Sequence, residues 1–277
     1  MTANQHIGPV TAFLLLTGIT SIAADLPEGL QQIGTIQAAS LRESSGVVVS
    51  DKNPQILWSH GDGRRPVLYA MDRSGKSVGV VIVAGVILHD WEDIASDHNG
   101  HLYVADIGNN DSLRTSLAVY EIPEPDPAAL PKEVKAIRSW KLSFPKNPFD
   151  AESLFIWQDQ GYVISKVFNN AKASLYRFPL KTTSEPVVLE RVSKLRVDSP
   201  VTGADISRDG KKIGLVSKAG AAILDVSNGF EGLAETKPVW MKFRHEHVEG
   251  CAFAQEGLIL TAESREIFLV TAPGFKP

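Results

Sequence analysis

Residues 91–106 read WEDIASDHNGHLYVAD, and this stretch decides the fold. A short apolar run is followed by a polar turn that contains Asn99 and Gly100, and then by a second apolar run that ends at Asp106. Asn-Gly pairs are typical of the tight turns that reverse a β-hairpin. We therefore predict an antiparallel hairpin with carboxylates at both ends of one face, from Glu92 and Asp106.

Four further segments repeat this pattern along the chain. The second residue of each segment, which is Glu92 in the stretch above, recurs about every 50 residues. This is the period of a β-propeller blade. The segments are SSGVVVSDKNPQILWSH from Ser44, AESLFIWQDQGYVISK from Ala151, VTGADISRDGKKIGLVSK from Val201 and VEGCAFAQEGLILTAE from Val248, and their second positions are Ser45, Glu152, Thr202 and Glu249.

Each repeat contains enough short apolar runs for four strands. The sequence therefore predicts an all-β fold, a β-propeller of five four-stranded blades within residues 25–277. The last repeat ends after three strands. We expect the orphan segment 29–37, GLQQIGTIQ, to pair with it, because this would close the ring and remove an exposed sheet edge. Six blades are the alternative if one repeat is degenerate, and the proline-rich residues 121–131 are expected to be a loop insertion.

Composition and the first residues bear on location and partners. Residues 1–24 contain no Lys, Arg, Asp or Glu, and we interpret them as a secretory signal peptide cut after Ala23 or Ala24. The alternative, an uncleaved anchor, has an apolar run too short to span a bilayer comfortably. We expect a periplasmic or extracellular protein without membrane insertion of the mature chain. The net charge of −4 over 277 residues argues against nucleic acid, and the single cysteine, Cys251, is expected to be buried.

The hairpins predict an acidic ring at one mouth of the propeller channel. If each hairpin supplies the two innermost strands of its blade, the residues that begin and end it lie side by side. The expected pairs are Glu92 with Asp106, Glu249 with Glu263, Glu152 with Lys166, Ser45 with His60, and Thr202 with Lys218.

Converging carboxylates must either take up protons or share a cation. Asn109 and Asn110 follow the second strand and add amide oxygens, and such all-oxygen donors favour Ca²⁺. The expected metal ligands are Glu92, Asp106, Asn109, Asn110, Glu152, Glu249 and Glu263. The alternative is an acidic ring neutralised by Lys166, Lys218 and Arg42.

A second candidate metal site lies in the sequence HEHVE, residues 245–249. Strand alternation would place His245, His247 and Glu249 on one face, as a transition-metal site requires. The simpler interpretation is a polar loop that enters the last blade. Trp58, Trp91 and Trp157 are expected to pack between blades.

Taken together, six motifs resemble the bacterial secreted β-propellers known as phytase-like or "esterase-like activity of phytase" proteins, over nearly the whole mature chain. DWEDIA and ADIGNN are the most specific parts. The motifs are RESSGVVVS (42–50), DWEDIA (90–95), YVADIGNN (103–110), DAESLF (150–155), VTGADIS (201–207) and VEGCAF (248–253).

This resemblance implies calcium at an acidic axial mouth, where phosphate binds and water is activated. It implies that Lys166 and Lys218 face the phosphate. We therefore expect a metal-dependent hydrolase of phosphoesters or other esters, with a small anionic or ester substrate. The expected catalytic residues are Glu92, Glu152 and Glu249, and the expected substrate-binding residues are His60, Lys166, Lys218 and Arg42.

Two alternatives remain open for the function. A non-catalytic binding module would recognise an envelope glycan or protein and hold a structural ion. A lactonase-like propeller would need one axial metal with about four ligands, which Glu92, Glu152 and Glu249 with an Asn could supply.

Overall fold

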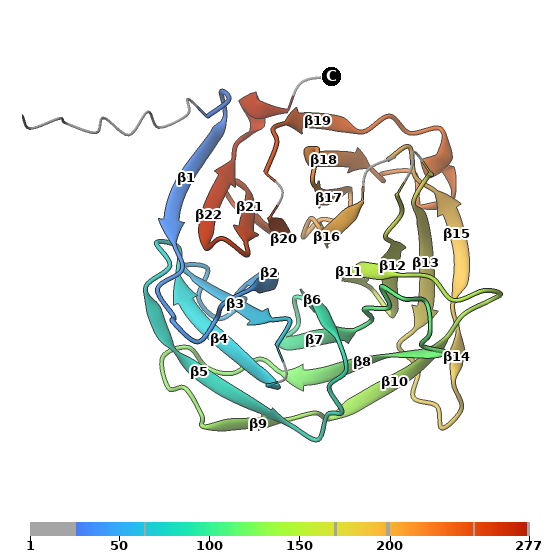
Figure 1. The fold of residues 1–277 in the computed structure, drawn as a ribbon, viewed down its shortest axis with the longest axis horizontal. Coiled ribbons are helices and arrows are strands. Elements are labelled where there is room, and N and C mark those ends of the chain that lie inside the picture. The colour runs from blue at the N-terminus through green and yellow to red at the C-terminus, as the bar shows by residue number, and fades with distance from the viewer. Residues whose placement is uncertain (1–25, 64, 169–170, 198–199, 246, 276–277) are drawn as a thin grey trace, which may run out of the picture.

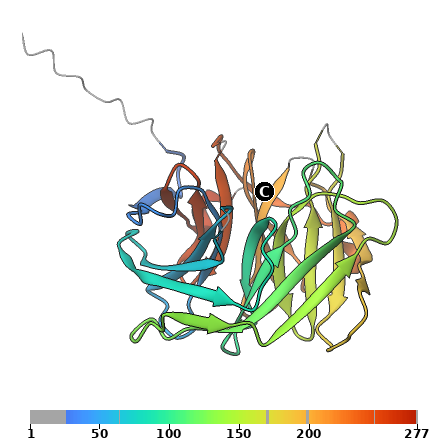
Figure 2. The same cartoon turned by 60° about the horizontal axis from the view of Figure 1, so that its bottom comes forward.

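The computed structural model describes residues 26–63, 65–168, 171–197, 200–245 and 247–275. The expected signal peptide, residues 1–24, lies outside the described residues. Five sheets, built mainly of antiparallel pairs, are arranged in a ring around a central axis, as the five-blade prediction requires (Figure 1). Figure 2 shows the same blades in an oblique view, turned by 60° from that of Figure 1.

The innermost strand of every blade comes from the start of one sequence repeat. These five strands are almost entirely buried, and each contacts its two neighbours around the ring. They are β2 (Ser44–Val49), β6 (Trp91–Ser96), β11 (Ala151–Trp157), β16 (Val201–Ile206) and β20 (Val248–Ala254).

Blades 1 and 2 each carry one strand more than expected. A short strand from another part of the chain pairs in parallel with the outermost strand of each blade, β9 with β5 and β14 with β10. Blade 1 continues with β3 (Ile56–Gly61), β4 (Val67–Asp72), β5 (Ser77–Ala84) and β9 (Glu133–Lys135), and blade 2 with β7 (His101–Asp106), β8 (Ser116–Pro123), β10 (Arg138–Ser143) and β14 (Val187–Val188).

Blades 3 and 4 have the predicted four strands. A single turn of 3₁₀ helix, η1 (Glu231–Ala234), lies against the outer strand of blade 3. Blade 3 continues with β12 (Gln160–Ser165), β13 (Ser174–Pro179) and β15 (Glu190–Lys194), and blade 4 with β17 (Lys212–Ser217), β18 (Gly220–Asp225) and β19 (Val239–Lys242).

Blade 5 joins the two ends of the chain and closes the ring. Its strands β21 (Gly257–Ala262) and β22 (Glu266–Val270) are followed by the 3₁₀ turn η2 (Ala272–Gly274). The outermost strand is β1 (Leu30–Thr35), which pairs antiparallel with β22 and matches Leu30 to Val270. The predicted closure of the ring by the segment 29–37 is confirmed.

The apolar core lies between neighbouring blades. Trp58 and Trp91 share one cluster between blades 1 and 2, and Trp157 packs against another between blades 3 and 4, as predicted. Cys251 is buried in the cluster between blades 4 and 5. Among the described residues, no helix is long and apolar enough to cross a membrane.

Candidate functional site

A β-bulge near the start of each innermost strand sets the direction of the residue at its second position. In blade 2, Trp91 pairs with Asp106 and Asp93 pairs with Ala105, so Glu92 has no partner across the ladder. The same register shift leaves Glu152, Thr202 and Glu249 unpaired, and in β2 the shift spans Ser45. A bulge re-aims the side chain of the extra residue.

The five bulge positions have two different uses. The hydroxyl of Ser45 donates to the carbonyl of Glu92 at 2.7 Å, and that of Thr202 donates to the carbonyl of Val248 at 2.9 Å. These two residues therefore link neighbouring blades. In the other three blades the bulge residue is a glutamate whose side chain lines the axial pocket.

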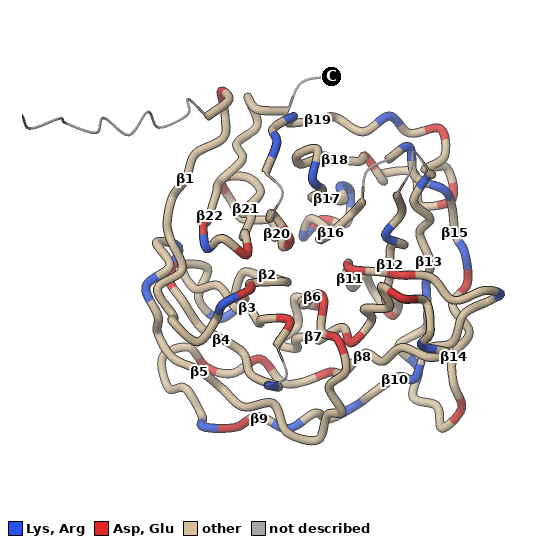
Figure 3. The backbone as a smooth tube through the Cα atoms, in the orientation of Figure 1, with Lys and Arg blue, Asp and Glu red and all other residues tan. Residues whose placement is uncertain are grey.

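The axial pocket has a volume of about 370 Å³ and lies at one mouth of the channel. Figure 3 shows acidic residues on the backbone around the centre of the ring, near β6, β11 and β20. The pocket brings together seven of the predicted site residues, which are Glu92, Asn110, Glu152, Lys166, Lys218, Glu249 and Glu263.

Two expected metal ligands, Asp106 and Asn109, have structural roles instead. Because of the bulge, Asp106 lies opposite Trp91, and its buried carboxylate pairs with the Arg114 guanidinium at 2.7 Å. The Asn109 side chain donates to the carbonyls of Arg114 and Phe149 and accepts from the Arg114 amide. The prediction that these two side chains face the pocket was wrong.

Two expected substrate-binding residues also lie elsewhere. His60 is fully buried with its ring edge-on to Trp91 at 5.7 Å, and burial lowers its pKa to about 4. It is a core residue because its side chain packs against Trp91 of the neighbouring blade 2. Arg42 lines a separate hollow on the flank of blade 1, together with Arg65 and Tyr69.

The sequence interpretation missed three charged groups in the pocket, Asp90, Glu43 and Asp62, and it assigned a fourth lining residue, His247, to a separate metal site. Asp90 lies two residues before Glu92, and this short spacing could have indicated that both acids line the same pocket. Glu43 and Asp62 come from loops beside β2 and β3, and His247 from the loop before β20. Loop residues show no periodicity in the sequence that would place them at the mouth.

Asp90 and Glu92 lie side by side against the backbone of Gly108. A Cβ atom at residue 108 would overlap both Asp90 Oδ2 and Glu92 Oε1, so the two carboxylate oxygens are neighbours across a space that only glycine leaves open. The Glu92 side chain is buried, with 7% of the residue exposed. Among the described residues, neither carboxylate accepts a hydrogen bond or forms an ion pair.

The opposite side of the pocket is partly neutralised. Lys166 Nζ forms an ion pair with Glu152 and lies 4.0 Å from Asp150 Oδ2. The second carboxylate oxygen of Glu152 is buried without a hydrogen-bond partner among the described residues. The alternative of an acidic ring neutralised by lysine therefore describes blade 3, but it does not describe the Asp90–Glu92 pair.

Burial and mutual repulsion favour the protonated forms of the pocket acids. Burial raises the pKa of Glu92, and the neighbouring Glu152 and Asp90 raise it further. Burial and Glu152 raise the pKa of Glu249 to about 8. Burial also raises the pKa of Glu152, although Lys166 opposes the shift. A cation would relieve this repulsion.

Asp93 fills the axis beneath the pocket. Its fully buried carboxylate accepts the Leu154 amide at 2.8 Å and the Ala204 amide at 3.4 Å, which belong to blades 3 and 4. In blade 1, a Cβ at Gly46 would lie 2.8 Å from Asp93 Oδ1. One side chain thus joins four innermost strands, and we call it the floor of the pocket.

The two histidines of the HEHVE motif do not form a metal centre with Glu249. His247 Nδ1 lies 3.2 Å from Glu263 Oε2, whereas His245 Nε2 lies 4.0 Å from a different carboxylate, that of Glu266. Within the described part of the chain, no three His, Cys, Asp or Glu side chains are already gathered to hold a metal ion.

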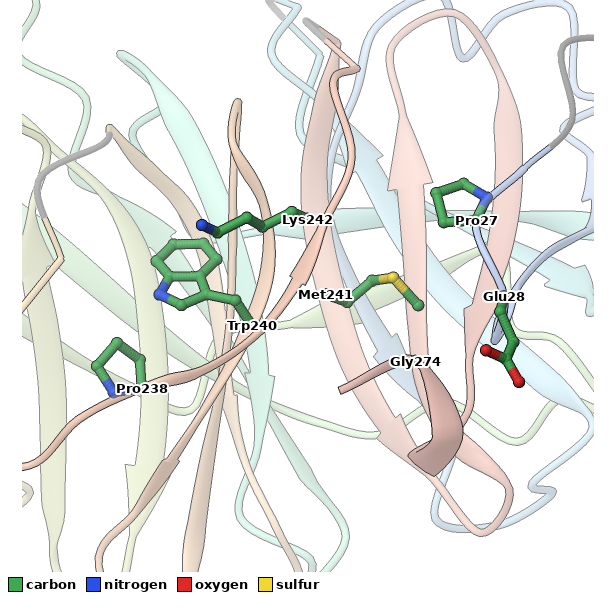
Figure 4. Close-up of a pocket in the computed structure, with 7 residues that line it drawn as sticks. All are labelled: Pro27, Glu28, Pro238, Trp240, Met241, Lys242 and Gly274. Atoms are coloured by element: carbon green, nitrogen blue, oxygen red, sulfur yellow. The ribbon is translucent and has the colours of Figure 1, made fainter. Parts of the chain in front are cut away.

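A larger hollow than the axial pocket lies away from the axis, beside β19. It has a volume of about 520 Å³ and is bordered by Pro27, Met241 and Gly274. Figure 4 shows Trp240 and Lys242 projecting to the same side of the strand. None of the predicted site residues borders it, so the axial pocket is the better candidate site.

Comparisons with known proteins support the fold. No family model matches the chain, and no curated protein matches it. The structure is similar to that of the PQQ-bound aldose sugar dehydrogenase of Streptomyces coelicolor, with a TM-score of 0.50 and 9% identity over 86% of this chain and 95% of that one. At this level of identity the likeness shows the β-propeller fold alone.

Two other solved structures have lower similarity scores. Hydrazine synthase of Kuenenia stuttgartiensis matches with a TM-score of 0.43 and 14% identity over 83% of this chain and 77% of that one. The WD40 repeats of RRP9 match with a TM-score of 0.44 and 8% identity over 89% of this chain and 98% of that one. The chain is a five-bladed β-propeller with an acidic axial pocket.

Proposed function

We propose that the axial pocket binds a divalent cation, Ca²⁺, and that the exported protein uses it as a metal-dependent hydrolase of phosphoesters or other esters. The observation that carries this proposal is the Asp90–Glu92 pair, two neighbouring carboxylates, one of them buried, that have no partner in the part of the chain that the structure describes. An unpaired buried carboxylate is costly, so it either takes up a proton or binds a cation.

The donors in the pocket suit calcium. Carboxylate and amide oxygens are available from Asp90, Glu92 and Asn110, and Ca²⁺ completes its shell with backbone carbonyls and water. In the proposed site, only two carboxylates bind the ion directly and water completes its shell. Such a site needs no group of three acidic or imidazole side chains, and none is found among the described residues. Compared with the ligand set expected from sequence, Asp90 replaces Asp106 and Asn109.

Hydrolysis would use residues from the remaining sides of the pocket. A bound cation would polarise the ester and lower the pKa of water. Glu249, whose pKa is raised to about 8, can exchange a proton near neutral pH. Lys218 lines the same pocket and can attract an anionic substrate. The resemblance of DWEDIA and ADIGNN to phytase-like propellers supports a phosphoester as the first substrate class to test.

Calcium titration tests the binding step. The mature chain would be stripped with EGTA and titrated with CaCl₂ by calorimetry, and its thermal unfolding would be measured with and without calcium. We expect saturable binding and a rise in melting temperature, because a ligand that binds only the folded state stabilises it. The absence of both effects would rule out the cation site.

Turnover is tested separately on phytate, glycerol phosphate, p-nitrophenyl phosphate and a lactone, each with calcium and with EGTA. We expect phosphoester hydrolysis that requires calcium and is lost in Glu249→Gln. Lactone turnover alone would assign a lactonase-like reaction instead.

A non-catalytic binding module is the second candidate function. The Lys166–Glu152 ion pair favours it, because this pair neutralises one of the three axial glutamates. In this case the pocket would hold a structural ion beneath a surface that recognises an envelope glycan or protein. It predicts calcium-dependent stabilisation without turnover of any ester in the panel.

A further inference from the structure

The loops that hold the Asp90–Glu92 pair are tied to one buried ion pair. Asp106 Oδ2 accepts the His89 amide at 2.8 Å, and Asp106 Oδ1 accepts the Asp90 amide at 3.1 Å. The same Oδ1 atom accepts Arg114 Nη2 at 2.7 Å. The backbone on which Asp90 stands is therefore bonded directly to the Asp106 carboxylate.

Arg114 holds the other wall of the same space. Its Nη1 atom donates to the Gly108 carbonyl at 2.6 Å, and its Nη2 atom donates to the Asp106 carbonyl at 3.0 Å. The Asp90 carbonyl accepts the Gly108 amide at 3.2 Å and joins the two loops. One guanidinium thus fixes the glycine against which both carboxylates lie.

Neither member of the ion pair borders the pocket itself. The Asp106 side chain is fully buried and the Arg114 side chain is 20% exposed. Both sit behind the acids, so they cannot ligate an ion that lies between Asp90 and Glu92. They make several charge-assisted hydrogen bonds to the backbone that carries or faces those acids.

We propose that Asp106 and Arg114 are positioning residues for the cation site: they hold the Asp90 and Gly108 loops at the separation that lets the Asp90 and Glu92 carboxylates share one divalent ion. This inference rests on the proposed function, since it assumes that the pocket binds calcium. Residues behind a metal site commonly change metal affinity by about 10- to 100-fold when they are altered.

Calcium affinity of purified variants tests the inference. In Arg114→Gln the two loops lose their shared donor, and we expect calcium to bind about 10-fold more weakly by calorimetry. Arg114→Lys keeps the charge and part of the hydrogen bonding, so it should recover part of the affinity. Gly108→Ala should weaken binding at least as much, because the new methyl group overlaps both carboxylates. Gly232→Ala is the matched control, since nothing lies within 4 Å of its Cβ.

Unfolding by urea in EGTA separates positioning from general stability. A merely structural role would lower the free energy of unfolding of Arg114→Gln and leave its calcium affinity equal to that of the wild type. That result would overturn the inference. If Arg114→Gln and Gly108→Ala bind calcium as tightly as the wild type and Glu152→Gln does not bind it, the inference is overturned. The proposed function would then still stand. A wild-type protein that binds no calcium would overturn both.

Discussion

Glu92 is a carboxylate that the fold buries at the axis without a hydrogen bond or ion pair among the described residues. The bulge at residue 92 forces this placement, because the backbone register leaves the side chain no other direction. A buried polar group without a partner is rare in native proteins, and a catalytic role or a bound ion is among its explanations. At the scale of the residue, Glu92 is therefore the most direct test of the site.

Glu92→Gln should stabilise the metal-free protein and abolish its response to calcium. The amide keeps the shape of the side chain but costs less to bury than a carboxylate, so we expect the free energy of unfolding in EGTA to rise by about 1–3 kcal/mol. Urea unfolding with EGTA and with calcium measures both effects. Glu235→Gln, at an exposed position directly after η1, should change neither. A variant that is less stable than the wild type in EGTA would contradict this account.

The hairpin is the element that the sequence predicts best, although its register is less predictable. The apolar runs and turns locate the paired strands β6 and β7, and the repeat correctly places Glu92, Glu152 and Glu249 at one mouth. Simple pairing of the hairpin ends also placed Asp106 there. The bulge adds one residue to β6 but not to β7, so Asp106 lies opposite Trp91 instead. No residue in the stretch marks that extra position as unpaired.

The innermost strands are also joined through buried acids, which should make stability depend on pH. Asp205 in β16 accepts the Phe253 amide of β20 at 2.7 Å, and burial raises its pKa to about 6. In the unfolded chain this group ionises near its ordinary pKa of 3.8. The folded protein therefore loses stability as pH rises from about 4 through 6, and the full cost is present above that range.

Asp205→Asn should remove this part of the pH dependence. One pKa unit corresponds to about 1.4 kcal/mol, so the shift at Asp205 accounts for about 3 kcal/mol between pH 4 and 7. Urea unfolding at pH 4, 5, 6 and 7 measures the slope. Asp159→Asn, at an exposed turn of blade 3, is the control and should keep the wild-type slope. An unchanged slope in Asp205→Asn would show that other groups dominate this range.

Closure of the ring is a property of the whole molecule that the sequence revealed through its unfinished last repeat. Strand β1 supplies the missing fourth strand of blade 5, and Leu30 fills the cluster between blades 4 and 5. The short parallel strands β9 and β14 were not predicted, because two or three residues carry no periodicity. They pair with strands of blades 1 and 2 that are distant in sequence.

Leu30→Ala should loosen the closure. Removing a buried leucine side chain costs about 2–5 kcal/mol, and here the loss falls on the strand that joins the two ends of the chain. We expect a lower urea midpoint for the whole domain, because opening blade 5 exposes its neighbours. Gln31→Ala alters the adjacent, exposed position of β1 and should have little effect. Equal stability of the two variants would mean that β1 contributes little to the ring.

The floor made by Asp93 gives the passage a dead end. A molecule that enters the acidic mouth cannot leave through the opposite face, so it must enter and leave through the same opening. A long polymer cannot thread through the ring, and only a terminal group or a protruding branch can reach the bottom. If the protein is an enzyme, it should trim from chain ends rather than cut in the middle, and its product should compete with the next substrate for the same opening.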